Sequence, residues 1–401
     1  MTLTTAPVTL APAHAQLVSA TLPLIGAHID EITTEFYRRM FAAHPELLRN
    51  LFNRGNQAQG AQQRALAASI ATFATHLVDP TLPHPVELLS RIGHKHASLG
   101  VTADQYPIVH EHLFAAIVAV LGAETVTADV AEAWDRVFWI MADTLIDLER
   151  ALYREAGVAD GDVYRRSRVV SREDDPSGAV LISVRSVGEP FGGPRVGQAA
   201  GQYLSVGVTL PDGARQLRQY SLVNAPDGTE LTFAVKAVAA ADGRPAGEVS
   251  SWITDHVRVG DLLDVTVPFG DLPVPSGREP LLLISAGIGV TPMVGILAHL
   301  AATAPRTVAH ALHADRSEQT HPLRERHRQL VAALPNATLQ TWYEDRGLLD
   351  LDGIDIPADA QVYLCGNTGF VQAVRAQLIA KGVELARVHC ELFAPNDWLL
   401  G

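Results

Sequence analysis

The sequence predicts a multidomain protein in which an all-α domain is followed by an antiparallel β-barrel and then by a doubly wound α/β domain. First, 401 residues exceed what a single hydrophobic core usually supports. Second, only seven of the 31 glycines fall in residues 1–157, and helices exclude glycine. Third, the hydrophobic period shortens to two near residue 168, and strands and helices alternate from residue 280. The predicted domains are residues 1–157, 158–275 and 276–401.

The composition narrows the possible partners and compartments. The chain carries 31 Lys and Arg against 44 Asp and Glu, a net charge of −13 that disfavours nucleic-acid binding. Its two cysteines, Cys365 and Cys390, form no CxxC pattern that would indicate a disulfide framework or a thiolate zinc site. The uncharged stretch from Leu281 to Pro305 is interrupted by glycines and prolines, which favours a strand, turn and helix over a membrane span. We expect a cytoplasmic monomer without nucleic-acid partners or transmembrane segments.

The first domain shows apolar residues at steps of three and four, which predict six or more helices. The stripes run from Ile25 to Met40, from Leu66 to Leu77, from Tyr106 to Val120 and from Trp134 to Leu152. The third of these helices is predicted to begin at Thr102 or Ala103, because Pro107 then lies in its first turn, where a missing N–H costs little.

The second and third domains differ in how their strands are connected. In the second, short alternating runs are separated by Pro-Asp-Gly turns, which predicts a small antiparallel barrel. Its strands are predicted around residues 169–170, 179–184, 203–209, 219–223, 231–238 and 262–267. In the third, strands at 281–285, 308–313, 338–342, 362–364 and 388–392 alternate with helices at 293–302, 323–333 and 370–380, an order typical of doubly wound α/β folds.

Two glycine turns follow strands of the α/β domain. Without a Cβ the backbone can approach a pyrophosphate, and the start of the next helix supplies free N–H groups. The turn residues are Gly287, Ile288, Gly289, Val290, Thr291 and Pro292, and then Cys365 and Gly366. Pro292 stands where the usual fingerprint has a third glycine. One such turn is compatible with ordinary strand-to-helix packing, but two at strand carboxyl ends favour a nucleotide site.

The preferred nicotinamide nucleotide stays open. Asp315 and Arg316 follow the second strand of this domain. An acid at that place suits a ribose 2′-OH, and an arginine suits a 2′-phosphate, so both NADH and NADPH are compatible with the sequence.

In the barrel, one strand combines residues suited to a phosphate and to an aromatic ring system. Alternation places Arg218 and Tyr220 on one side, and Gln219 and Ser221 on the other. Further ring contacts and N–H donors would come from Tyr203 and from the segment that contains Val249 and Ser250. Alone, the strand is equally compatible with a surface arginine beside a core tyrosine.

One histidine of the helical domain lies on an apolar stripe. His96 continues the stripe of Leu89 and Ile92, whereas His94 lies off it. A buried, hydrogen-bonded histidine is the simpler interpretation of such a residue. Tyr106 and Glu149, at the edges of their own stripes, could orient the ring and raise its basicity, as outer-shell residues do for metal ligands.

Residues of other segments in the helical domain point to a gas-binding pocket around this histidine. Tyr37 lies at the edge of its stripe, Gln62 lies one turn before Leu66, and Phe52 lies in a corner between helices. A proximal histidine with a distal phenol and amide is what an oxygen-binding haem pocket requires.

Together these residues resemble the flavohaemoglobins, nitric oxide dioxygenases that join a globin to a ferredoxin-reductase-like module. The resemblance spans about residues 14–397. It rests on Phe36-Tyr37, Leu51-Phe-Asn53, Gln62 with Leu66, Lys95-His96, Gln105-Tyr106, Gly201-Gln-Tyr203, Arg218-Gln-Tyr-Ser221, Gly287-Ile-Gly-Val-Thr-Pro292, Tyr363-Leu-Cys-Gly366 and Glu391-Leu-Phe-Ala-Pro395. The chain departs from the family pattern in reading Phe-Ala-Pro where Phe-Gly-Pro is common, and in one extra residue between Pro45 and Phe52.

The resemblance implies a role for each matching residue. Around haem b it implies His96 as the iron ligand, Tyr106 and Glu149 as a relay acting on it, Tyr37, Gln62 and Leu66 as the residues that stabilise the oxygen ligand, and Phe52 as a haem contact. Around FAD it implies Tyr203, Arg218, Gln219, Tyr220, Ser221, Leu392, Phe393, Ala394 and Pro395. Lys95 and Glu391 match residues that tune the haem and flavin potentials, and residues 287–292 would hold NADH or NADPH.

The implied reaction passes electrons from NAD(P)H through FAD to haem, where nitric oxide and O2 become nitrate. Two alternatives stay open. One is a haem-based gas sensor or oxygen store with a vestigial reductase. The other is a peroxide or quinone reductase in which the globin is incidental.

Overall fold

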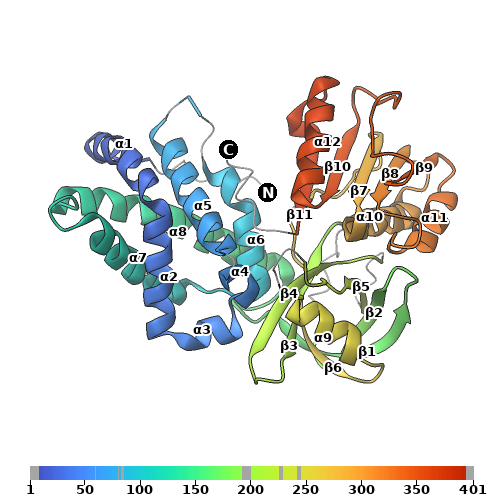
Figure 1. The fold of residues 1–401 in the computed structure, drawn as a ribbon, viewed down its shortest axis with the longest axis horizontal. Helices are drawn as coiled ribbons and strands as arrows, with labels where there is room; N and C mark the ends of the chain where they lie inside the picture. The colour runs from blue at the N-terminus through green and yellow to red at the C-terminus, as the bar shows by residue number, and fades with distance from the viewer. Residues whose placement is uncertain are drawn as a thin grey trace. The chain divides into compact units, whose positions relative to one another are not determined.

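The structure, a computed structural model, describes residues 9–58, 60–79, 81–82, 85–191, 200–224, 229–241 and 245–393. The described residues form two compact units, one of residues up to 163 together with 214–216, and the other of residues 164–213 and those from 217 on. Helices α1 to α8 lie in the first unit, and the strands of two sheets follow it along the chain (Figure 1). The predicted fold class is confirmed, while the three predicted domain ranges stay predictions. Ala394 and Pro395 lie outside the described residues.

The helices of the first unit pack around one apolar core that includes Ile32, Phe36, Met40 and Phe73. They are α1 (Pro12–Ala27), α2 (Ile29–Ala43), α3 (Pro45–Asn50), α4 (Arg54–Ala58), α5 (Ala61–Val78), α6 (Ser90–Leu99), α7 (Tyr106–Leu121) and α8 (Ala128–Ala156), with 3₁₀ turns at Pro85–Leu89 and Ala103–Gln105.

The stripe predicted from Ile25 to Met40 belongs to two helices. α1 ends at Ala27, and His28 adopts φ −111° and ψ 11° before α2 begins at Ile29. Ile25 and Ile32 are both buried in the same core, so the break does not move the stripe away from it. A periodicity of three and four cannot reveal such a break, because the stripe continues across it.

The first sheet is antiparallel and, among the described residues, has six strands in the order β4-β3-β6-β1-β2-β5. The strands are β1 (Tyr164–Asp174), β2 (Ala179–Ser186), β3 (Tyr203–Thr209), β4 (Arg215–Ser221), β5 (Glu230–Lys236) and β6 (Leu262–Thr266). Edge strands β4 and β5 are linked where Leu222 bridges to Phe233 and the N–H of Val223 donates to the carbonyl of Thr232 at 2.9 Å. The sheet is therefore a partly closed barrel.

Two predictions for the barrel are corrected. The strand predicted at 219–223 begins at Arg215 and ends at Ser221, because the next two residues leave it to bridge to β5. The segment around Val249 and Ser250 forms a helix, α9 (Glu248–His256), which the sequence analysis did not predict. It buries Val249 and Ile253 in the barrel core.

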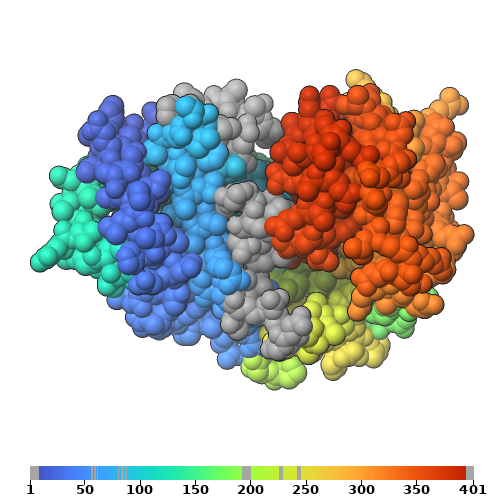
Figure 2. Space-filling model, turned by 45° about the horizontal axis from the view of Figure 1, so that its top comes forward, coloured from blue at the N-terminus to red at the C-terminus, as the bar shows by residue number. Residues whose placement is uncertain are grey.

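The second sheet is parallel, in the order β11-β10-β7-β8-β9. Its elements are β7 (Leu281–Ala286), α10 (Val290–Thr303), β8 (Ala309–Asp315), α11 (Arg324–Ala332), β9 (Ala337–Tyr343), β10 (Gln361–Gly366), α12 (Thr368–Ala380) and β11 (Val388–Leu392), with a 3₁₀ turn at Gly287–Gly289 after β7. In the space-filling view of Figure 2, the end of the described chain, which includes α12, forms the red part of the surface. The strand order reverses between β7 and β10, where ligands bind in doubly wound folds.

No helix among the described residues combines the length and apolar character that crossing a membrane requires.

Candidate functional site

His96, Tyr106 and Glu149 meet in the helical unit, each from a different helix. Nδ1 of His96 lies 2.8 Å from Oε1 of Glu149 and 3.2 Å from the hydroxyl of Tyr106. Tyr106 also donates to the same carboxylate oxygen at 2.5 Å. Because a carboxylate only accepts, the proton of the neutral imidazole belongs on Nδ1, and Nε2 carries the lone pair that can bind a metal.

The electrostatics of this triad keep the phenol of Tyr106 protonated. Glu149 is buried, with 2% of its side chain exposed. Burial raises the pKa of Tyr106 above its ordinary value, and the neighbouring charge of Glu149 raises it further. The phenol therefore stays a donor throughout the working pH range, and the triad polarises His96 in the way that outer-shell carboxylates polarise metal-binding histidines.

Two local features bring the three side chains together. A Cβ at Gly93 would lie 2.4 Å from Cδ2 and 2.9 Å from Cγ of Leu148, so a larger residue would displace the Leu148 side chain or α6, and glycine lets the two helices pack closely where His96 reaches Glu149. Thr102 and Gln105 form a capping box over Ala103–Gln105, after which α7 begins at Tyr106. The helix start predicted at Thr102 or Ala103 is thus a 3₁₀ turn. Gly93 was not among the predicted residues of the site, although a glycine inside a predicted helix is a signal of close packing.

Tyr37 is the polar residue of an aromatic cluster on α2. Its ring packs against Phe36, Phe41 and Phe52, at centroid distances of 4.7, 5.5 and 6.0 Å. Burial raises the pKa of its phenol above the ordinary range, and hydrogen bonding by the side chains of Gln57 and Gln62 opposes part of that rise. The structure therefore brings together Tyr37, Gln62 and Phe52, with the hydroxyl protonated and able to donate.

The remaining predicted residues of the helical unit lie on two helices. Leu66 is partly buried on α5 and packs against the common core. Lys95 is exposed on α6, next to His96.

Strand β4 carries the predicted flavin residues. Tyr220 stacks on Phe233 at 5.5 Å, and its hydroxyl is buried with no hydrogen-bond partner among the described residues. Burial raises the pKa of this phenol. The side-chain amide of Gln219 donates to Oγ of Ser205 at 3.0 Å, which fixes the opposite face of the strand. A buried polar atom without a partner is costly, so the Tyr220 hydroxyl is a place where a ligand can supply one.

Other predicted flavin residues surround or follow this strand. Nη1 of Arg218 donates to the carbonyl of Leu217 at 2.6 Å, while Tyr203 opens β3. Ser221 is buried at the end of β4, Ser250 is buried in the first turn of α9, and its hydroxyl accepts from the N–H of Val238 at 3.2 Å. Glu391 and Leu392 end β11, with Glu391 buried, and Phe393 is half exposed.

The two glycine turns of the α/β domain lie against each other at the reversal of strand order. A Cβ at Gly289 would lie 2.6 Å from the carbonyl oxygen of Cys365 and 2.9 Å from the nitrogen of Gly366, so this contact requires glycine. Gly287 has φ +54° and nothing within 4 Å of its missing Cβ, which leaves its backbone open to a ligand. Val290, Thr291 and Pro292 then form the buried first turn of α10. The turns lie in front of the N-terminus of α10, where free N–H groups of a helix can bind a phosphate.

The chain was compared with known proteins. A family model for globins matches residues 34–145, and one for the oxidoreductase NAD-binding domain matches residues 283–376. The chain is 39% identical to the flavohemoprotein of Chromobacterium violaceum over 95% of this chain and 98% of that protein. It is 40% identical to that of Bordetella parapertussis over 96% of this chain and 98% of that protein.

The chain belongs to the flavohemoprotein family. Among solved structures, the flavohemoglobin of Malassezia yamatoensis with bound FAD and heme matches at a TM-score of 0.87 with 34% identity, covering 96% of this chain and all of that one. The FAD/NAD-binding domain of a nitric oxide dioxygenase from Vibrio cholerae matches at 0.52 with 32% identity, covering 57% of this chain and 98% of that one. The predicted family resemblance is confirmed, whereas the individual residue roles stay predictions.

For this flavohemoprotein we predict that Arg218→Ala weakens FAD retention while haem content stays unchanged. Loss of a charge-assisted phosphate contact costs about 1.5–3 kcal/mol, or roughly 10- to 150-fold in affinity. The measurement is the FAD-to-haem ratio of purified protein. Arg185→Ala is the control, because Arg185 belongs to the same sheet and forms an exposed pair with Glu230. Equal FAD occupancy in the Arg218 variant and the wild type would remove Arg218 from the flavin site.

Three buried histidines of the α/β domain pack together. The rings of His313 and His321 stack at 3.7 Å, and His327 lies 6.0–6.1 Å from both. Burial lowers the pKa of His321 to about 2 and that of His327 to about 3. Neither ring nitrogen of His327 has a hydrogen-bond partner among the described residues. No metal-binding group of three or more His, Cys, Asp or Glu side chains was found in the part of the chain that the structure describes.

We therefore predict that the α/β domain, which contains these three histidines, loses stability as the pH falls below about 6.5. The unfolded chain takes up these protons near pH 6.5 and the folded chain does not, so each histidine costs on the order of 1.4 kcal/mol per pH unit below that value. Thermal unfolding followed between pH 8 and pH 5 measures the effect. His327→Leu keeps an apolar side chain in place and should flatten the dependence. An identical pH dependence in the variant would show that His327 is not the titrating group.

Proposed function

We propose that the protein is an NAD(P)H-dependent nitric oxide dioxygenase that uses haem b and FAD. The observation that carries the proposal is the imidazole of His96, oriented by a buried carboxylate so that Nε2 is left for iron. Full-length similarity to flavohemoproteins supports it, as does the relative of known structure that holds FAD and heme. The reaction also needs a binding site for the electron donor, and the paired glycine turns have the features of a dinucleotide-binding site.

The residues present fit both groups. The His96 triad is the donor set that a haem iron takes from a globin, one neutral imidazole with a carboxylate behind it. The buried Tyr220 hydroxyl without a partner, on the strand of Arg218, suits a flavin with its polar ring edge and phosphates. Residues Tyr203, Gln219 and Ser221 would complete this side of the flavin site.

When bound, FAD accepts the two electrons of a nicotinamide hydride and releases them singly, and haem accepts one electron at a time. Converting one nitric oxide and one O2 into nitrate consumes one electron, so each NAD(P)H supports two such reactions. Because NAD(P)H gives two electrons at once and haem accepts one, the chain needs a flavin-binding part as well as a haem-binding part.

The side chains of this chain perform defined tasks in that scheme. Tyr37 would donate a hydrogen bond to the O2 substrate, and the side chains of Gln57 and Gln62 would hold the phenol in place. Glu149 keeps the proton on Nδ1 of His96 and strengthens the donor character of Nε2, while Tyr106 holds the carboxylate. Leu66 and Phe52 contribute an apolar wall.

Two other functions compete with this proposal. A gas sensor or oxygen store would need no hydride supply, so the paired glycine turns count against it. A peroxide or quinone reductase would need no oriented proximal histidine, so the His96 triad counts against that one.

The test of the proposal is a visible spectrum followed by a rate measurement on the same sample. We expect a Soret band together with flavin absorbance, and aerobic nitric oxide consumption that requires NAD(P)H. A protein with both absorbances that consumes nitric oxide no faster than buffer would refute the dioxygenase.

A further inference from the structure

The loop that follows β8 lies next to the glycine turn that follows β7. Ala314 pairs with Ala286, the residue before Gly287, so Asp315 and Arg316 begin the loop at the same sheet edge as the turn. In doubly wound nucleotide domains this place faces the adenosine ribose, whose 2′ substituent distinguishes NADH from NADPH. Which of these two side chains can face a ligand therefore decides the preferred nucleotide.

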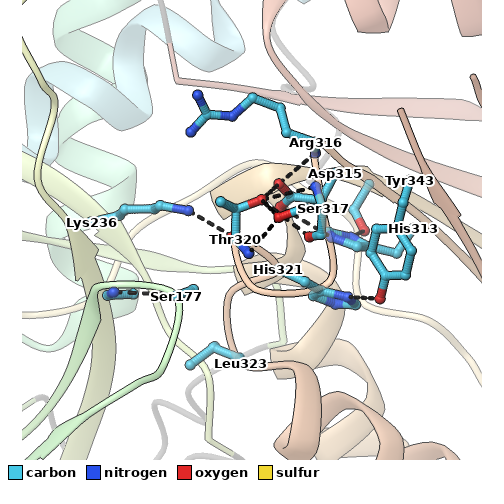
Figure 3. Close-up of polar contacts among 12 residues, drawn as sticks. Ser177, Lys236, His313, Asp315, Arg316, Ser317, Thr320, His321, Leu323 and Tyr343 are labelled. Carbon is cyan, nitrogen blue, oxygen red and sulfur yellow. Dashed lines mark hydrogen bonds and ion pairs between the residues drawn. The ribbon is translucent and has the colours of Figure 1, made fainter. Parts of the chain in front are cut away.

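The carboxylate of Asp315 is committed to its own loop. One oxygen, Oδ1, accepts from the N–H of Arg316 at 2.7 Å and from the hydroxyl of Thr320 at 2.6 Å. The other, Oδ2, lies 3.7 Å from Nε2 of His313 and has no hydrogen-bond partner among the described residues, but it is buried, and only 5% of the side chain is exposed. Figure 3 shows the carboxylate of Asp315 within this network. A ribose hydroxyl has no exposed oxygen of Asp315 to bind.

The side chain of Arg316, in contrast, is exposed and leads out of the network (Figure 3). Its guanidinium makes no hydrogen bond or ion pair with the residues that the structure describes. Lys236, from β5, reaches the same loop and donates from Nζ to the carbonyl of Thr320 at 2.7 Å. Two further N–H groups of that ammonium remain for other acceptors.

Lys236 lies among charges of both signs, which differ in the hydrogen-bonding groups that they leave for a ligand. Burial lowers the pKa of Lys236, and the neighbouring charge of Arg316 adds to that effect while Asp315 opposes it. The second nearby acid, Asp175, is occupied as well: its Oδ2 accepts from the N–H of Leu323 at 3.2 Å, and its Oδ1 accepts from the N–H of Ser177. Three of the four carboxylate oxygens accept hydrogen bonds within the fold and the fourth, Oδ2 of Asp315, is buried, whereas the side chains of Arg316 and Lys236 have N–H groups left for a ligand.

We infer that Arg316 and Lys236 bind the 2′-phosphate of the adenosine ribose, and that NADPH is the preferred hydride donor of this protein. The inference rests on the proposed function, because it requires a nicotinamide dinucleotide in the α/β domain. The planar guanidinium of Arg316 suits bidentate contact with a phosphate, and Lys236 adds a second positive charge.

The test compares two adenosine fragments by calorimetry on the full-length holoprotein. Adenosine 2′,5′-bisphosphate carries the extra phosphate, and adenosine 5′-monophosphate lacks it. We expect the first to bind at least about tenfold more tightly, a ratio set by a charge-assisted contact. In Arg316→Ala the ratio should fall toward one. Arg306→Ala is the matched control, since Arg306 is an exposed arginine near the opposite end of β8, and it should keep the wild-type ratio.

The outcomes separate the inference from the proposed function. If both fragments bind the wild type equally, or if the monophosphate binds more tightly, the assignment of Arg316 fails while the nucleotide site stands. If neither fragment binds, the inference fails together with the nucleotide site of the proposed function. The ratio of kcat/KM for NADPH to that for NADH should change in parallel with the fragment ratio in the variants.

Discussion

His96→Ala should yield a protein that no longer holds haem in its normal five-coordinate form, while FAD content stays near that of the wild type. The change removes the ring nitrogen that Glu149 and Tyr106 orient toward the metal. Haem affinity should fall by more than about tenfold, because loss of an outer-shell partner alone typically costs roughly 10- to 100-fold. The measurement is the Soret spectrum together with the haem-to-protein ratio.

His94→Ala is the matched control for this prediction. His94 belongs to the same helix, two residues earlier, and it lies on a different face from His96. Its removal should leave the haem spectrum unchanged. If His94→Ala lost the haem and His96→Ala kept it, the proximal face of α6 would be wrongly assigned.

Tyr37→Phe should slow nitric oxide consumption at low oxygen without slowing the reductase. The phenol is buried and protonated, and its hydrogen bond to the oxygen ligand would be lost while the ring volume is kept. A hydrogen bond to a charged acceptor contributes about 1.5–3 kcal/mol, so oxygen should dissociate roughly 10- to 150-fold faster. Oxygen release and aerobic nitric oxide consumption are the two measurements.

NAD(P)H-driven reduction of cytochrome c on the same preparation is the control, because Tyr37 lies far along the chain from the flavin and nucleotide motifs. That rate should match the wild type. Unchanged oxygen release together with unchanged nitric oxide consumption would falsify the distal role of Tyr37, and loss of both activities would indicate misfolding instead.

The elements of the fold were largely predictable because their signals are local. A change in glycine use and in hydrophobic period separates helices from strands, and the strands of the parallel sheet were predicted within a few residues of β7 to β11. The His96 triad was predictable in part, since His96 lies on an apolar stripe and Tyr106 and Glu149 lie at stripe edges. That these three side chains converge depends on tertiary packing, which a stripe does not report.

The features that escaped prediction depend on contacts between distant segments. Gly93 matters because of Leu148, a residue of another helix, and helix α9 forms because Val249 and Ile253 complete the barrel core. The sequence left Asp315 and Arg316 as competing signals. Hydrogen bonds from Thr320 and from the backbone, invisible in the sequence, are what remove Asp315 from the ribose side.

The central claim is that one chain couples a two-electron nicotinamide donor to nitric oxide dioxygenation, and stoichiometry tests it most directly. Purified holoprotein would be given limiting NADPH with excess nitric oxide and O2, and nitric oxide, NADPH and nitrate would be measured together. The account predicts two nitric oxide molecules consumed and two nitrate ions formed for each NADPH oxidised. NADPH oxidation that proceeds at the same rate without nitric oxide, with no nitrate formed, would contradict it.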